Sequence, residues 1–140
     1  MSDNSKNKIY KGIGLIAGII IIICCITLNI FTKNSLYNGK IANNIFIQGI
    51  DVSNMTKSEA IEVVNKKYTP QNLNLVYQDN SYEIDYKDID LKYDTKNIVN
   101  KAYNSTRTGS YFNDITSYMN IKSSGKKYSI KVTYDENKLD

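Results

Sequence analysis

The pattern of apolar and polar residues divides the chain into an N-terminal apolar run and a longer mixed region. The run from Gly12 to Phe31 has no charged residue and lies between Lys11 and Lys33. As a helix, its 20 residues would reach about 30 Å, the thickness of a bilayer's hydrocarbon core. We therefore predict a transmembrane helix over residues 12–31, preceded by a short polar tail over residues 1–11.

Basic residues give the predicted span an orientation. Lys6, Lys8 and Lys11 precede it, and lysines beside a span favour the cytoplasmic face. We expect the tail to be cytoplasmic and the residues beyond the span to be extracytoplasmic. A cleaved signal peptide is the alternative, but the run is long for one and no small-x-small cleavage site follows closely. A lipoprotein signal would need a small residue just before its cysteine, but Ile23 precedes Cys24. We interpret the run as an uncleaved, single-pass signal-anchor in the cell membrane.

Beyond the span, the pattern predicts a polar linker, a short strand and a helix. Residues 32–44 are mostly polar and form the linker, and the β-rich stretch at residues 45–47 begins the ordered domain. This stretch ends at Gly49, where we expect a turn or bulge. Thr56 stands three residues before Glu59, which is the spacing of a capping box at a helix start. Apolar residues then follow at helical spacing until Pro70, which ends the helix.

The next segment alternates in the manner of a β-hairpin. Residues 72–78 and 81–86 form its two strands, and Asp79-Asn80 forms the loop because this pair tolerates positive φ. Pairing across that loop places six apolar side chains on one face. The predicted pairs are Leu73 with Tyr86, Leu75 with Ile84, and Tyr77 with Tyr82.

The remaining residues predict one more amphipathic helix and two more strands. The helix opens near Asp94-Thr95 and buries Ile98, Val99, Ala102 and Tyr103. Residues 106–117 suggest a loop leading into a short helix. Met119 and Ile121 start a strand, residues 123–126 turn it, and residues 128–134 alternate as a half-buried strand. The order β-α-β-β-α-(α)-β-β predicts a small α+β domain over residues 45–140.

Composition limits what this domain can do. Apart from the four lysines that flank the span, the chain has 14 basic residues, and 13 acidic residues follow the span. The region beyond the span is therefore nearly neutral, and the pI near 8.9 does not indicate nucleic-acid binding. Both cysteines, Cys24 and Cys25, lie in the predicted span, and the chain has no histidine. These facts exclude disulfides, Cys-His and Ser-His catalysis, and His/Cys zinc sites from the domain.

Two further patterns carry chemistry only in other contexts. Ser-x-x-Lys occurs at Ser123 and Ser124, but the companion motifs of penicillin-recognising enzymes are missing and a hairpin loop is favoured. Four aspartates cluster before the second helix but fit no EF-hand loop, so we expect solvated acids at a helix start. They are Asp85, Asp88, Asp90 and Asp94. We expect neither a metal nor a cofactor.

Two stretches resemble a known family. Residues 45–60, IFIQGIDVSNMTKSEA, resemble the opening V-x-G-(I/V)-D-(V/L)-S-x-(L/M)-T-x-x-E-A of the YoaR-like peptidoglycan-binding domain. Residues 82–84 followed by Ala102–Gly109, AYNSTRTG, look like its A-(Y/F)-x-x-G-R-x-G segment. Thr106 stands where that pattern has Gly, and a turn needing positive φ there would strain a β-branched residue.

The resemblance implies a peptidoglycan-binding domain behind one membrane anchor in a Gram-positive bacterium. In that family the domain precedes a VanW domain, linked by name to vancomycin resistance, or an L,D-transpeptidase (YkuD-type) catalytic domain. We therefore expect a non-catalytic module that binds peptidoglycan. The alternatives are the N-terminal part of such a transpeptidase or VanW-type protein, and an envelope scaffold that binds another protein. Against the family's usual length, we expect the domain to be incomplete after Asp140.

A candidate contact lies in the irregular segment after the second helix. Aromatic side chains stack on sugars and an arginine can hold a carboxylate bidentately, and peptidoglycan offers both groups. Tyr111, Phe112 and Tyr118 fit the core pattern poorly and follow Arg107. We propose Arg107, Tyr111 and Phe112 as ligand-binding residues. The alternative is a structural Arg107 that pairs with an acid such as Asp114.

Overall fold

The computed structural model describes residues 3–138 and divides the chain into two compact units, residues 1–38 and 39–140. The first unit consists of helix α1 (Asp3–Phe31) and the short π-helix η1 (Thr32–Leu36). Residues 7–36 are long and apolar enough to cross a membrane, and their most apolar 18-residue stretch has a mean hydropathy of 2.8. This finding rests on length and composition, and signal sequences share both properties.

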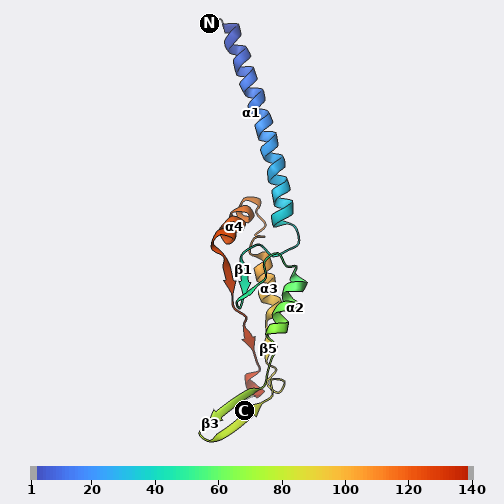
Figure 1. The fold of residues 1–140 in the computed structure, drawn as a ribbon, viewed down its shortest axis with the longest axis vertical. Helices are drawn as coiled ribbons and strands as arrows, with labels where there is room; N and C mark the ends of the chain where they lie inside the picture. Colours follow the sequence, from blue (N-terminus) through green and yellow to red (C-terminus); the bar gives the residue numbers. More distant parts are fainter. Residues whose placement is uncertain (1–2, 139–140) are drawn as a thin grey trace. The chain divides into compact units, whose positions relative to one another are not determined.

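The second unit is a mixed α+β domain, as the sequence predicts (Figure 1). Its central sheet has the strand order β2-β1-β6. Strand β1 (Ile45–Ile47) pairs antiparallel with β2 (Ile50–Asp51) and parallel with β6 (Lys126–Tyr128). Gln48 and Gly49 join β1 to β2 with φ angles of 48° and 80°, which confirms the turn expected at Gly49.

Helix α2 (Lys57–Lys67) begins at the predicted capping box. The Thr56 backbone N–H donates to Glu59 Oε2 at 2.7 Å, and the Glu59 N–H donates to Thr56 Oγ1 at 3.3 Å. Together these bonds satisfy two amides that a bare helix start would leave open. The helix ends just before Tyr68 and Pro70, and it buries Ala60 and Val64.

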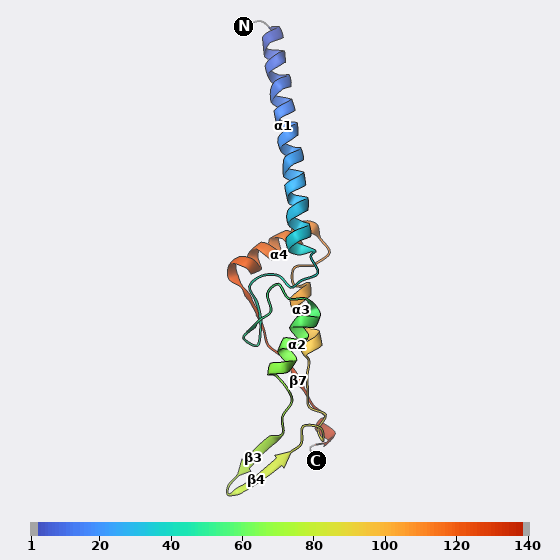
Figure 2. The same cartoon turned by 45° about the vertical axis from the view of Figure 1, so that its right-hand side comes forward.

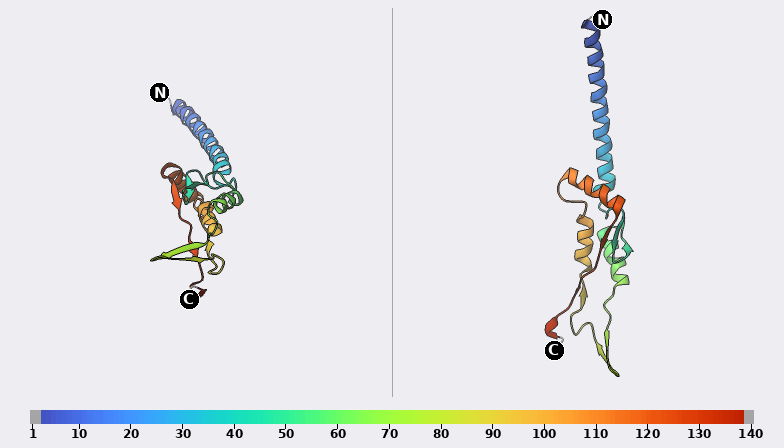
Figure 3. Two further views of the ribbon diagram at one scale, coloured as in Figure 1. Left: turned by 60° about the horizontal axis from the view of Figure 1, so that its bottom comes forward. Right: turned by 90° about the vertical axis from the view of Figure 1, so that its left-hand side faces the viewer.

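Helix α3 (Thr95–Asn104) lies beside α2, and the two helices cover the region around β1 (Figures 1 and 3). The predicted positions Val99 and Ala102 are fully buried, while Ile98 and Tyr103 are half-buried. The segment before β1 completes this core, since the Ile41 N–H donates to the Met55 carbonyl at 2.8 Å and the Asn54 N–H donates to the Ile41 carbonyl at 3.0 Å. The core side chains are Ile41, Ala42, Ile45, Ile47, Val52, Ala60, Val64, Val99 and Ala102.

Helix α4 (Tyr111–Ser124) corrects the prediction of a strand at Met119 and Ile121. Its inward positions are Asp114, Tyr118 and Ile121, which recur at helical spacing. Because the first of these positions is the polar residue Asp114, the apolar residues alone do not show helical spacing here. The helix continues to Ser124, and Gly125 follows it with φ of 72°, so the predicted hairpin turn at residues 123–126 is wrong.

The predicted strand over residues 128–134 is divided between two sheets. Its first part belongs to β6, and β7 (Val132–Thr133) pairs antiparallel with β5 (Lys92–Tyr93). A single-turn 3-10 helix, η2 (Glu136–Lys138), follows β7. The region after α4 therefore contains two short strands where the sequence pattern predicts one longer strand.

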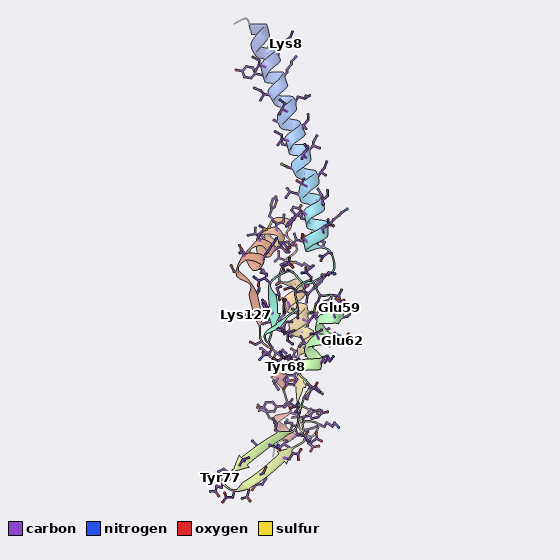
Figure 4. All side chains as sticks on the ribbon, in the orientation of Figure 1. Lys8, Glu59, Glu62, Tyr68, Tyr77 and Lys127 are labelled. Atoms are coloured by element: carbon purple, nitrogen blue, oxygen red, sulfur yellow. The ribbon has the colours of Figure 1, made fainter. Side chains whose placement is uncertain are left out.

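The β-hairpin is present but with a different register. Strands β3 (Leu73–Tyr77) and β4 (Asn80–Ile84) pair Tyr77 with Asn80, so Gln78 and Asp79 form the loop. The predicted register is wrong by two residues. The predicted loop is Asp79-Asn80, but the loop lies one residue earlier, where Gln78 takes a positive φ of 53°. A shift of two keeps the same side chains on one face. The hairpin extends away from α2 and α3, with Tyr77 near its tip (Figures 2 and 4).

Candidate functional site

Arg107, the first predicted ligand-binding residue, lies on the loop between α3 and α4. Its Nη1 donates to the Tyr103 carbonyl at 2.6 Å and its Nη2 donates to the Lys40 carbonyl at 2.7 Å. The guanidinium also stacks over the Tyr103 ring, with Cζ 3.9 Å from the ring centre. Arg107 thus ties the end of α3 to the segment before β1.

The departure from the family pattern at Thr106 causes no strain. Thr106 is buried and its φ is not among the positive values of the described residues. The positive φ of this loop falls on Gly109 instead, at 88°, where no Cβ opposes it. A threonine at position 106 is therefore compatible with the loop.

Asp114 holds the same loop from the other side. Its carboxylate is almost fully buried, and Oδ1 accepts hydrogen bonds from the Thr108 backbone N–H and from Thr108 Oγ1, the latter at 2.8 Å. A buried carboxylate is stable only when such donors surround it. Together, Arg107 and Asp114 fix the path of the chain into α4.

Tyr111 and Phe112 occupy the first turn of α4. Their rings meet edge to face at 5.9 Å between centres, and Phe112 is 79% exposed and Tyr111 40%. Tyr118 does not share this exposure. It is 4% exposed and its hydroxyl accepts from Asn43 Nδ2 at 3.3 Å, so it belongs to the core. The segment therefore presents an open aromatic pair at the start of α4, next to a loop that buried polar contacts hold in place.

A second surface was missed by the sequence analysis. Tyr68, just after α2, and Tyr93, in β5, meet edge to face with ring centres 6.3 Å apart. They line two adjacent hollows of about 320 and 310 Å³. The two tyrosines are 25 residues apart and both fit a core pattern, so sequence spacing gave no signal that they meet at the surface.

The weaker patterns of the sequence have ordinary structural roles. Ser123 and Ser124 lie in the last turn of α4, and the Ser123 hydroxyl donates to the Asn120 carbonyl at 3.0 Å. Among the aspartates, Asp90 pairs with Lys138 at 2.7 Å and with Lys92 at 3.7 Å. The hydrogen bond and charge of Lys138 hold the pKa of Asp90 below its usual range. Within residues 3–138, no three potential metal ligands gather.

One family model matches the C-terminal part of the chain. Residues 82–140 match the model of the family described as "Putative peptidoglycan binding domain". The matched region begins inside β4 and contains α3, the Arg107 loop and α4. It does not include residues 45–60, which carry the first of the two resemblances. The chain has no match among curated proteins or among solved structures.

Proposed function

We propose that this protein is a membrane-anchored, extracytoplasmic module that binds peptidoglycan and carries out no chemistry of its own. The match of residues 82–140 to the peptidoglycan-binding family carries the proposal. The apolar helix over residues 7–36 supports an anchor beside the cell wall. Lys6, Lys8 and Lys11, which precede the uncharged run at residues 12–31, favour a cytoplasmic N-terminus, which leaves residues 39–140 on the wall side.

The contact that we propose is the segment from Arg107 to Phe112. The open rings of Tyr111 and Phe112 offer apolar faces for the C–H groups of a sugar, and loops on rigid scaffolds often carry binding. Arg107 keeps the loop in position through two backbone carbonyls and Tyr103. A binding module of this kind serves equally by itself or ahead of a VanW-type or L,D-transpeptidase domain.

Pelleting with purified sacculi tests the proposal. The full-length protein in detergent should sediment with sacculi in a saturable manner. Phe112→Ala should weaken binding about tenfold, because truncating a central aromatic contact commonly costs more than about 1 kcal/mol. The matched control is Tyr77→Ala, which removes another exposed ring at the hairpin tip and should leave binding unchanged.

The outcomes separate the function from its site. A wild-type protein that stays in the supernatant would contradict peptidoglycan binding. Sedimentation that Phe112→Ala leaves intact would keep the function and reject the Arg107–Phe112 contact. Unfolding of the Phe112 variant is not expected, since most of this ring is exposed to solvent.

A further inference from the structure

The two hollows beside Tyr68 and Tyr93 have the features of a small binding site. Tyr68, Thr69 and Tyr93 line both of them, so the tyrosine pair stands in a shared wall. Each hollow, at about 320 or 310 Å³, reaches the lower end of the range for small-molecule sites. Figure 4 shows Tyr68 where α2 gives way to the segment that leads to the hairpin.

The tyrosine pair is held in place by the backbone on both sides. The Tyr68 hydroxyl donates to the Gln48 carbonyl at 2.9 Å, and the Tyr68 N–H donates to the Val64 carbonyl at 2.9 Å. Tyr93 pairs with Val132 in the β5–β7 ladder. A ring fixed at both its hydroxyl and its backbone loses little further freedom when a ligand stacks on it.

The polar lining has the chemistry of amides, hydroxyls and cations. Gln71 and Asn72 line the first hollow with Lys67, and Asn65 lines the second with Lys92. Neither lining contains an Asp or a Glu. Amide side chains both donate and accept, so those of Gln71 and Asn65 match hydroxyl and N-acetyl groups, while Lys67 suits a nearby carboxylate. The amide of Asn72 is bonded to Glu83 and to the Tyr86 N–H.

We propose that the Tyr68–Tyr93 double hollow binds a short segment of N-acetylated glycan strand, with adjacent sugar rings on the two sides of the tyrosine pair. This inference rests on the proposed function and assigns it a second contact. The aromatic faces take the C–H groups of the rings, and the amides of Gln71 and Asn65 take the N-acetyl groups. Lys67 then lies where the carboxylate of an attached wall peptide would approach, while Lys92 pairs with Asp90 at 3.7 Å.

Titration with a defined sugar tests the site apart from sacculus binding. The probe is chitotetraose, a β-1,4 tetramer of N-acetylglucosamine, added to full-length protein in detergent with ¹³C-labelled tyrosine rings. The Tyr68 and Tyr93 signals, assigned with single Tyr→Phe variants, should shift saturably, and the signal of Tyr77, near the hairpin tip, should not shift. Cellotetraose, which lacks the N-acetyl groups, should shift them at least fivefold more weakly.

Variants distinguish a binding site from a structural one. Gln71→Ala changes an exposed polar side chain and should weaken chitotetraose binding at least fivefold without altering the fold. Tyr93→Phe keeps the stacking ring and should bind within twofold of wild type, whereas Tyr93→Ala should abolish the shifts. Unmoved Tyr68 and Tyr93 signals, or an unaffected Gln71→Ala variant, would overturn this inference even if the protein pellets with sacculi. Failure to pellet would overturn the proposed function by a separate readout.

Discussion

Two regions of the second unit have apolar side chains on their strands but differ in what covers these side chains. In strand β1, Ile45 and Ile47 are completely buried. In the β3–β4 hairpin, Leu75 and Tyr77 are 53% and 68% exposed. The local sequence therefore predicts a strand in both places, but burial depends on partners that lie far away in the sequence. Strand β1 obtains them from β6, which pairs with it after about 80 intervening residues, and from α3.

The difference has an energetic consequence. A two-stranded hairpin is marginally stable alone, and within residues 3–138 no third strand pairs with β3 or β4. The region around β1 gains the transfer free energy of its buried side chains, which the hairpin largely lacks. We expect the hairpin to open locally while the rest of the unit stays folded.

The largest expected effect comes from one truncation in each region. Ile47→Ala should lower the free energy of unfolding by about 2–5 kcal/mol, because it removes a fully buried side chain and leaves a cavity. Leu75→Ala should lie within about 0.5 kcal/mol of wild type. Urea unfolding of the full-length protein in detergent, followed by tyrosine fluorescence, measures both. Equal costs would show that the hairpin is packed as tightly as β1.

A smaller effect is expected from the buried acid of the Arg107 loop. Asp114→Ala should cost about 1–3 kcal/mol, because the Thr108 N–H and hydroxyl would lose their acceptor. The same urea experiment gives the cost, and proteolysis within residues 105–110 should become faster. A variant with wild-type stability and protease resistance would mean that Asp114 does not hold this loop.

The smallest effect belongs to the capping box of α2. Thr56→Ala should cost about 1 kcal/mol, as a lost helix cap does. Hydrogen bonds from the Thr56 backbone and then its side chain lower the pKa of Glu59. A lowered carboxyl pKa adds stability above the unfolded value and loses it as pH falls through the folded value. The stability difference between wild type and Glu59→Gln should therefore shrink on acidification below the ordinary glutamate range. A difference independent of pH would contradict this role.

Local signals in the sequence were sufficient where an element is defined by its own residues. The capping box at Thr56 and Glu59, the burial of Val99 and Ala102, and the turn at Gly49 are all present. Each depends on residues within one or two helical turns, so the sequence contains the whole cause.

Predictions that depended on distant partners fared less well. Met119 and Ile121 suggested a strand because Asp114 broke the apolar helical pattern, although that acid is buried against Thr108. Tyr118 fits the core pattern of the sequence poorly but packs in the core. The Tyr68–Tyr93 surface forms only when the end of α2 meets β5, so no local pattern could have indicated it.

Hydrogen exchange with wall fragments tests peptidoglycan binding and both contacts together. The full-length protein in detergent is followed by mass spectrometry with and without soluble glycan-peptides released from sacculi by a muramidase. The account predicts slower exchange in peptides covering residues 108–116, 67–73 and 91–95, and unchanged exchange at the hairpin tip over residues 76–82. Unchanged exchange throughout the second unit, or slowing confined to the hairpin tip, would contradict it.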